Sequence, residues 1–371
     1  MIRVFEPRLT INDKISVLLA LYKSEISGNS NSVKNFEKKL SEKFNRKFAI
    51  ALTNGTVALE IAIKSLNLKK DDEVIVPSFT IISCLSAILR NNLVPVFVDV
   101  DKNTWNITLE NIQKSLTKKT RAVLMVHTYG LPAEALEIEE FCKNNNLYLI
   151  EDAAEAHGQT YQDKPCGSFG DVSTFSFYVN KHITTGEGGA VLTDSKNKYE
   201  EIKQMINLDF NNNGSRFNHD NFYWNYRLSG LQASLGISQT KNLNNIIKQK
   251  QKQAEIYNKF FGDYSNLFKI PELHFRGSQN NYWVYGLAIE NKSSREELMK
   301  YLFNNKIETR EFFWPLHLQN ALGGEYENLS LPISEFLGKN GFYIPIGPHI
   351  TKKDQEFIAK KIINFFNQKL I

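Results

Sequence analysis

The sequence contains little cysteine and no long apolar run. Its three cysteines, Cys84, Cys142 and Cys166, are scattered along 371 residues without the spacing of metal ligands, which argues against a disulfide framework and fits a reducing cytoplasm. No apolar run approaches the roughly 18 residues of a membrane span, and residues 1–8 contain no apolar signal core. We therefore expect a cytoplasmic protein with no membrane partner.

Two common nucleotide-binding glycine motifs are also missing. Without a Gly-x-Gly-x-x-Gly after an early strand or a Gly-x4-Gly-Lys-Ser/Thr, nicotinamide and P-loop functions lose their main support. The net charge is only +5, and the lysines are spread along helix-like stretches such as 241–252, so we predict no nucleic-acid partner. His127 and His157 lack a partner at ligand spacing, and we assign no metal site.

Short apolar runs alternate with helix-like stretches between about residues 46 and 194. Such alternation predicts an α/β fold with a mostly parallel sheet covered by helices on both faces, and ligands bound beyond the carboxyl ends of the strands. The length allows two domains: a large one over residues 1–243 and a smaller α+β domain over 244–371. The runs predicted to be strands are 47–52, 73–76, 94–98, 122–126, 147–150 and 172–177.

The clearest candidate for anion binding is the turn at residues 53–56, which lies between a predicted strand and a predicted helix over 57–66. A helix N-terminus presents free N–H groups and the positive end of the helix dipole to an anion. Asn54, Gly55 and Thr56 are therefore candidate phosphate contacts. Ser176, at the end of a later apolar run, could add a hydroxyl donor.

Lys181 is the most informative residue, because it follows the run 172–177 and precedes a glycine-containing loop. A lysine amine placed there can form a Schiff base, and pyridoxal phosphate is the commonest cofactor held in this way. Glu151 and Asp152 follow another buried run, and a carboxylate at this place could hold the pyridine nitrogen in its protonated form; the alternative role of Asp152 is to cap a following helix. With the anion site, the sequence offers a group for each part of pyridoxal phosphate, which we predict as cofactor.

Three long segments, 150–158, 170–177 and 180–189, together resemble the DegT/DnrJ/EryC1/StrS family of sugar aminotransferases, and the resemblance extends over nearly the whole chain. It implies a fold-type I pyridoxal-phosphate enzyme and a homodimer with shared active sites. It also implies amino transfer from L-glutamate to C-4 of a nucleotide-linked 4-keto-6-deoxyhexose, with GDP-4-keto-6-deoxymannose favoured.

Four alternatives stay open: a UDP- or dTDP-linked sugar, amination at C-3, a pyridoxal-phosphate-dependent sugar 3-dehydratase, and a non-catalytic relative. The dehydratases that resemble this family replace the lysine by histidine, whereas here His182 comes one position late and Lys181 is in register. A non-catalytic relative would be expected to lack Lys181 or Asp152.

The resemblance also implies roles for residues around the cofactor. Lys181 would be the catalytic lysine, Asp152 the partner of the ring nitrogen, and Glu155 a neighbour of the phenolic oxygen. Ile81 stands where relatives usually place an aromatic residue, so we expect plain apolar contact there, or ring stacking by Phe79 instead.

Four further residues are predicted to bind the cofactor phosphate or the substrate. Asn225 would reach into the phosphate site of the neighbouring subunit. His157, Arg310 and His317 are the predicted substrate-binding residues.

Overall fold

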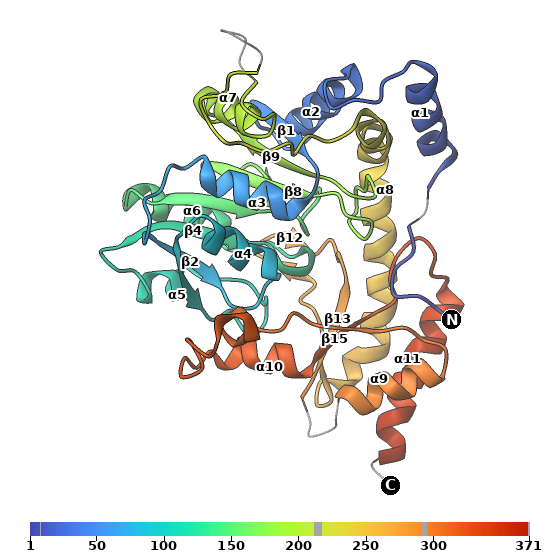
Figure 1. The fold of residues 1–371 in the computed structure, drawn as a ribbon. Coiled ribbons are helices and arrows are strands. Elements are labelled where there is room, and N and C mark those ends of the chain that lie inside the picture. Colours follow the sequence, from blue (N-terminus) through green and yellow to red (C-terminus); the bar gives the residue numbers. More distant parts are fainter. Residues whose placement is uncertain (8, 211–216, 291–294, 370–371) are drawn as a thin grey trace.

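The computed structural model describes residues 1–7, 9–210, 217–290 and 295–369. At its centre is a seven-stranded sheet with the order β1-β9-β8-β5-β4-β2-β3 (Figure 1). All six runs predicted as strands are present, with ends within two residues of the prediction. The strands of the sheet are β1 (Phe48–Leu52), β2 (Glu73–Pro77), β3 (Val94–Val98), β4 (Thr120–Val126), β5 (Tyr148–Asp152), β8 (Val172–Ser176) and β9 (Gly189–Thr193).

Six of these strands run in the same direction. The pairs β2·β3, β2·β4, β4·β5 and β5·β8 are parallel, whereas β9 is antiparallel to both β8 and β1. The carboxyl ends of β1, β2, β4, β5 and β8 therefore lie along one edge of the sheet. The predicted α/β class with a mostly parallel mixed sheet is confirmed.

Helices cover both faces of the sheet, because successive side chains of a strand point to opposite sides. Ile50, Val74 and Ile150 pack with α3 (Gly55–Lys64), α4 (Ile82–Arg90) and α7 (Lys196–Met205). Ala49, Ile75 and Leu149 point the other way, into a second core. That core includes residues of α2 (Asn31–Lys43), α5 (Leu109–Lys114), α6 (Ala135–Asn144) and α8 (Gly230–Phe261).

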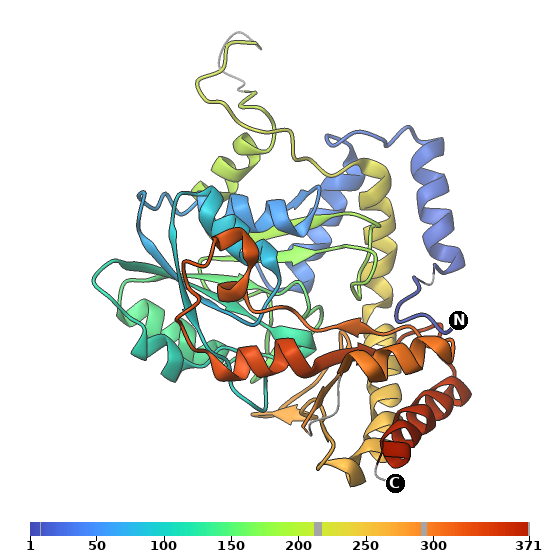
Figure 2. The same ribbon diagram turned by 60° about the horizontal axis from the view of Figure 1, so that its bottom comes forward.

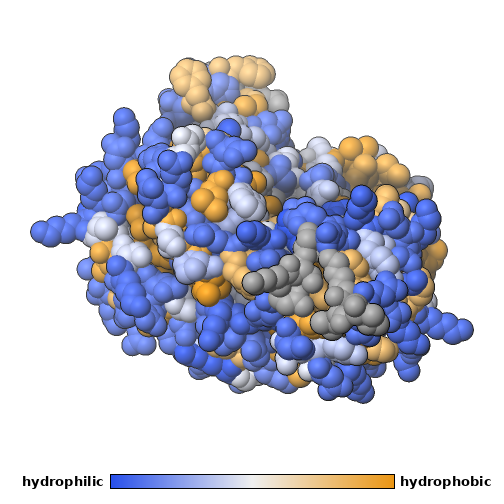
Figure 3. Space-filling view, turned by 90° about the horizontal axis from the view of Figure 1, so that it is seen from below, coloured by the Kyte–Doolittle hydropathy of each residue, from blue (hydrophilic) through white to orange (hydrophobic). Residues whose placement is uncertain are grey.

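The smaller part of the molecule is built on a four-stranded antiparallel sheet with the order β10-β13-β15-β14. Its strands are β10 (Phe268–Lys269), β13 (Tyr285–Ile289), β14 (Arg310–Glu311) and β15 (Gly341–Ile344), and its helices are α9 (Arg295–Asn304), α10 (Pro332–Asn340) and α11 (Lys352–Lys369). Figure 2 brings these three helices to the front. Hydrophilic side chains cover most of the face seen from below, with apolar residues scattered among them (Figure 3).

The long helix α8 connects the two parts (Figure 1). The sequence pattern predicts a connecting helix over 244–261 only. The helix has 32 residues and starts at Gly230, because Ser229 and Gln232 form a capping box. The predicted domain boundary at 243/244 thus falls inside a continuous helix and remains a prediction. At the other end of the chain, Ile2 pairs with Ile307 and packs on the core of the smaller part.

The remaining elements are short or peripheral. They are α1 (Ile11–Tyr22), β6 (Thr160–Tyr161), β7 (Lys164–Pro165), β11 (His274–Phe275), β12 (Ser278–Gln279) and the 3₁₀ turns η1 (Thr128–Gly130), η2 (Gly262–Tyr264), η3 (Leu316–Leu318) and η4 (Asn320–Leu322). The polar, irregular stretch 207–225 predicts a long loop. Its described residues contain only an isolated bridge between Asn207 and Asn225; residues 211–216 lie outside the described part. Among the described helices we find none with the length and apolar character needed to cross a bilayer.

Candidate active site

A cleft of about 320 Å³ opens at the carboxyl edge of the large sheet. Its volume lies within the usual range for a small-molecule site. The structure brings eight of the predicted site residues to its wall: Asn54, Gly55, Thr56, Ile81, Asp152, Glu155, Ser176 and Lys181. They come from segments up to 127 residues apart in sequence (181 − 54) that meet because parallel strands end at the same edge.

The N-terminus of α3 forms one end of the cleft. The side chain of Asn54 caps this helix by accepting a hydrogen bond from the N–H of Val57 at 2.9 Å. A Cβ on Gly55 would lie 2.7 Å from the Cβ of Ser176, so only glycine lets the helix end approach β8 this closely. The hydroxyls of Thr56 and Ser83 are 2.8 Å apart. Free N–H groups, the helix dipole and hydroxyls at one place suit a phosphate.

The Lys181 amine lies in a mostly buried part of the cleft. Its Nζ is 3.6 Å from Glu155 Oε1, and the Lys181 side chain is only 10% exposed. Nζ also lies 3.8 Å from the centre of the Trp283 ring. Burial lowers the pKa of Lys181, opposed by the charges of Glu155 and Asp152, and burial raises the pKa of Glu155 to about 7, opposed by Lys181. Burial therefore moves the pKa of each group from its usual value toward neutral pH.

Glu155 is held by an unusual turn that follows β4. Tyr129 has φ 56° and ψ 20°, a left-handed conformation that is rare for a bulky residue. Its N–H donates to Glu155 Oε2 at 2.9 Å. No sequence pattern predicts that Tyr129 binds Glu155, because its left-handed backbone conformation is visible only in the folded chain.

Asp152 lies at the end of β5 with its carboxylate in the cleft. Oδ1 accepts from the N–H of Ala154 at 3.0 Å, and Oδ2 accepts from the Cys84 thiol at 3.5 Å. Burial raises the pKa of Asp152, while the Ala154 N–H and the Lys181 charge lower it. The helix-capping alternative is not supported, because residues 153–159 form turns and no helix.

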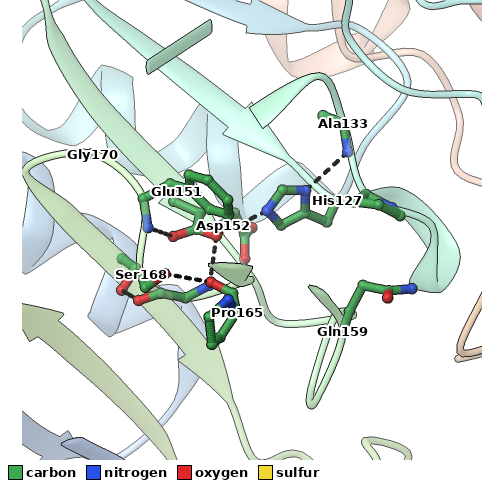
Figure 4. Close-up of polar contacts among 12 residues, drawn as sticks. His127, Ala133, Glu151, Asp152, Gln159, Pro165, Ser168 and Gly170 are labelled. Atoms are coloured by element: carbon green, nitrogen blue, oxygen red, sulfur yellow. Dashed lines mark hydrogen bonds and ion pairs between the residues drawn. The ribbon is translucent and has the colours of Figure 1, made fainter. Parts of the chain in front are cut away.

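The neighbouring Glu151 points to the opposite side of the sheet, as strand alternation requires (Figure 4). His127 Nδ1 accepts from the Ala133 N–H at 3.0 Å, so Nε2 carries the proton and donates to Glu151 at 2.9 Å. The N–H of Phe169 donates to the other carboxylate oxygen at 2.8 Å. The ligand atoms of His127, Glu151 and Cys166 all lie within 4.8 Å of one another, but hydrogen bonds account for the histidine and the carboxylate without a metal.

His157 does not line the cleft. Its ring is fully buried, packs near Phe44, Phe175 and Phe177, and accepts a hydrogen bond from the Ile183 N–H at 3.2 Å. Burial lowers the pKa of His157 to about 3, so the ring is neutral. This position gives no support to its predicted contact with substrate.

The other two predicted substrate residues are also not among the residues that line the cleft. His317 is buried, and its Nδ1 is 2.6 Å from Ser78 Oγ, so it joins the segment after Phe313 to the loop after β2. Arg310 is half exposed, pairs with Glu308 at 3.6 Å, and borders a small hollow that shares Tyr343 with the cleft. The predicted contact of Arg310 with substrate stays a prediction.

Asn225 and Phe79 also lie off the wall of the cleft. Asn225 is exposed, and its side-chain oxygen accepts from Arg227 Nε at 3.0 Å. Phe79 is fully buried against Tyr129, Phe312 and Phe313, so it cannot replace the missing aromatic at Ile81. Ile81 itself lines the cleft and is 38% exposed.

The sequence reading missed the aromatic residues on the far wall of the cleft, Trp283, Phe313 and Tyr343. Trp283 lies in the apolar run 282–289, which carries no chemical signal, and Phe313 lies in the segment of Arg310 and His317 without a chemical signature of its own. No local pattern shows that the Trp283 ring faces the amine of a lysine more than 100 residues earlier in the chain.

The cleft at the carboxyl edge of the sheet contains a buried lysine beside a carboxylate. This arrangement is typical of enzymes that use an amine as their reacting group. Residues 10–363 match the model of the DegT/DnrJ/EryC1/StrS aminotransferase family, and the chain belongs to this family. The predicted family, enzyme class and pyridoxal phosphate cofactor are confirmed.

Two curated relatives resemble the chain over almost its full length. The GDP-perosamine synthase of Escherichia coli O157:H7 is 36% identical, with 99% of each chain covered. The GDP-perosamine synthase of Vibrio cholerae is 34% identical, covering 99% of this chain and 100% of the relative. Among solved structures, an aminotransferase from Psychrobacter cryohalolentis superposes with a TM-score of 0.90 at 27% identity over 98% of each chain.

Proposed function

We propose that this enzyme transfers the amino group of L-glutamate to C-4 of a GDP-linked 4-keto-6-deoxyhexose. The observation that carries the proposal is the buried cluster of Lys181, Glu155 and Asp152 in one cleft. The choice of a GDP-linked sugar rests on the similarity to GDP-perosamine synthases from three bacteria, at 31–36% identity.

The cleft fits pyridoxal phosphate on the chemistry of its wall. The N-terminus of α3 offers an anion site beside Ser176. The Asp152 carboxylate is buried, and its described partners are an N–H and a thiol, so a protonated ring nitrogen would compensate its charge. When bound, the cofactor supplies an electron sink for the carbanion that amino transfer requires.

The residues of this chain then have separate tasks. Lys181 attaches the cofactor and, once released, moves the proton at Cα of the amino donor, a task favoured by an amine whose pKa burial has lowered. Glu155 accepts or returns a proton beside that amine. The Trp283 ring covers the amine and limits access of water.

A homodimer with shared sites is part of the proposal. Asn225 is exposed and outside its own cleft, which suits a residue that completes the phosphate site of a second copy. An apolar surface also lies uncovered along residues 9–26 and can bury area against a partner. Its large exposed side chains are Leu9, Ile11, Ile15, Leu18, Leu19, Leu21, Tyr22 and Ile26.

Mixing two inactive variants tests the shared site. Lys181→Ala lacks the amine, and Asn225→Asp sets a carboxylate against a phosphate, so we expect both homodimers to be inactive. Refolded together in equal amounts they form about half heterodimers, each with one intact site, and about a quarter of wild-type activity should return. Heterodimers without recovery would show that Asn225 does not act across the interface.

We also propose that the enzyme works in the cytoplasm. All three cysteines are free and buried, and synthesis from a nucleotide-linked sugar suits that compartment. Labelling of the native protein with a thiol reagent before and after unfolding would test the redox state. Three reactive thiols only after unfolding support the assignment, and a disulfide in protein isolated from cells contradicts it.

The substrate is tested with GDP-, UDP- and dTDP-linked 4-keto-6-deoxyhexoses, each supplied with L-glutamate. We expect one GDP-linked product in which NMR places the new amine at C-4. A dTDP-linked 3-amino product is the informative alternative, because a dTDP-3-amino-3,6-dideoxygalactose transaminase from Aneurinibacillus thermoaerophilus is 32% identical over 89% of the chain. Loss of a hydroxyl from the sugar without gain of nitrogen would indicate a dehydratase.

A further inference from the structure

Lys250, on α8, is a buried lysine for which the mechanism above has no use. It is 4% exposed, and its amine donates to the backbone carbonyl of Trp283 at 2.7 Å. Within the described residues no carboxylate pairs with it, and burial lowers the pKa of Lys250 to about 7. An amine buried without a counter-charge is costly, so its position needs an explanation beyond the packing of the helix.

The residue that Lys250 binds is the one that touches the catalytic lysine. The indole ring of Trp283 lies 3.8 Å from Lys181 Nζ, and its Nε1 donates to the carbonyl of Asn180, the residue before Lys181, at 2.9 Å. The position of the ring is therefore tied to both the amine and the backbone that carries it.

The backbone of Trp283 also reaches the other side of the amine. Its N–H donates to the carbonyl of Tyr129 at 3.2 Å, and the N–H of Tyr129 binds Glu155, which faces Lys181. A continuous path of contacts thus runs from Lys250 through Trp283 and Tyr129 to Glu155 and Lys181. The path reaches α8 at the Trp283 carbonyl, to which the Lys250 amine donates.

We propose that Lys250 is a positioning residue for the amino-transfer reaction: through the Trp283 carbonyl it fixes the indole ring against the Lys181 amine. A cation over an indole face is stabilised relative to a neutral amine. The placement of the ring therefore helps to set how readily Lys181 loses and regains its proton. The proposal depends on Lys181 being the reacting lysine, which borohydride labelling tests separately.

The groups that face Lys250 allow two effects of opposite sign. Lys181, His182 and His157 interact with it electrostatically, and His349 lies near it across Gly347. Burial lowers the pKa of both His157 and His182 far enough to keep them neutral. A charged Lys250 repels the Lys181 ammonium directly, whereas the ring that it positions favours that ammonium, so the route through Trp283 must be separated from the direct charge.

A double-mutant cycle separates them. The variants are Lys250→Met, Trp283→Leu and their combination, with Lys248→Met, a substitution of an exposed lysine on the same helix, as the matched control. In cofactor-free protein, the rate of trace acylation of Lys181 is measured against pH by mass spectrometry of its peptide. The holoenzyme is assayed for kcat and KM.

We expect Lys250→Met to shift the Lys181 labelling profile and to lower kcat roughly fivefold, while Lys248→Met leaves both unchanged. In the Trp283→Leu background, which has no aromatic face over the amine, the same substitution should have at most a small further effect. Equal effects in both backgrounds would overturn the proposal in favour of direct charge, and an unshifted profile would reduce Lys250 to a packing role. If Lys250→Met does not fold, Lys250→Gln, which keeps a donor, enters the same cycle: equal profile shifts in both backgrounds would again overturn the proposal.

Discussion

The two walls of the cleft are built from different kinds of residue. The wall at the edge of the large sheet carries Lys181, Asp152, Glu155 and the N-terminus of α3, whereas the opposite wall presents the rings of Trp283, Phe313 and Tyr343. Charge and hydrogen-bonding groups that suit the cofactor lie on the first, and shape and apolar area on the second. The comparison teaches that loss of a residue on the first wall should affect the chemical step, and loss of Phe313 or Tyr343 on the second mainly the fit of the acceptor. Trp283 belongs with the first wall in its expected effect, because the centre of its ring lies 3.8 Å from Lys181 Nζ.

The largest effect is expected for Lys181→Ala. Without the amine there is no covalent attachment of the cofactor and no group at this place to move the Cα proton, so turnover should fall below detection. Reduction of the loaded wild-type enzyme with borohydride, followed by peptide mass spectrometry, should find the label on Lys181. A label on another lysine would move the chemistry away from this wall.

Adjacent carboxylates on β5 provide the next test. Asp152→Asn cannot hold a protonated ring nitrogen, and we expect at least a hundredfold lower kcat, equivalent to about 2.7 kcal/mol. Glu151→Gln instead leaves an amide among donors, with an expected loss of about 1–3 kcal/mol of unfolding free energy and little change in kcat. Urea unfolding and steady-state kinetics of both variants decide; the reverse pattern would exchange their roles.

Glu155 should make the stability of the cofactor-free protein depend on pH. Burial raises its pKa from 4.5 to about 7, so the native state binds the proton more tightly than the unfolded chain. Its contribution to stability is then full below about pH 4.5 and is lost by about pH 7, a change of up to about 3 kcal/mol. Glu155→Gln has no proton to lose, so the wild type should become less stable relative to the variant as the pH rises through that window. A constant difference would mean that Lys181 keeps Glu155 ionised throughout.

The smallest effect is expected on the aromatic wall. Phe313→Leu removes a ring but keeps an apolar surface, and an aromatic contact contributes about 0.5–1.5 kcal/mol beyond its area. We expect a roughly two- to tenfold higher KM for the keto-sugar and an unchanged KM for L-glutamate. Equal rises in both constants would show that the two walls are not divided in this way.

More of the fold than of the site could be predicted from the sequence. The six apolar runs predicted the positions of six strands. Their alternation with helix-like stretches predicted a mostly parallel sheet, since few other arrangements suit that order. The sequence did not place the start of α8 at Gly230, and β9, a five-residue strand after the glycine loop, was not among the predicted runs. Both elements follow segments whose polar or glycine-containing composition favours a loop.

For the site, the sequence by itself determined which groups are available: an amine at Lys181, a carboxylate at Asp152 and a glycine turn before a helix. It could do so because these residues are marked by neighbours within a few positions. Only the tertiary structure decided that Asp152 faces the cleft while Glu151 faces away, that His157 lies in the core, and that Trp283 covers the amine with Lys250 behind it. These facts depend on the pleat of a strand and on contacts between distant segments, which the order of residues along the chain does not display.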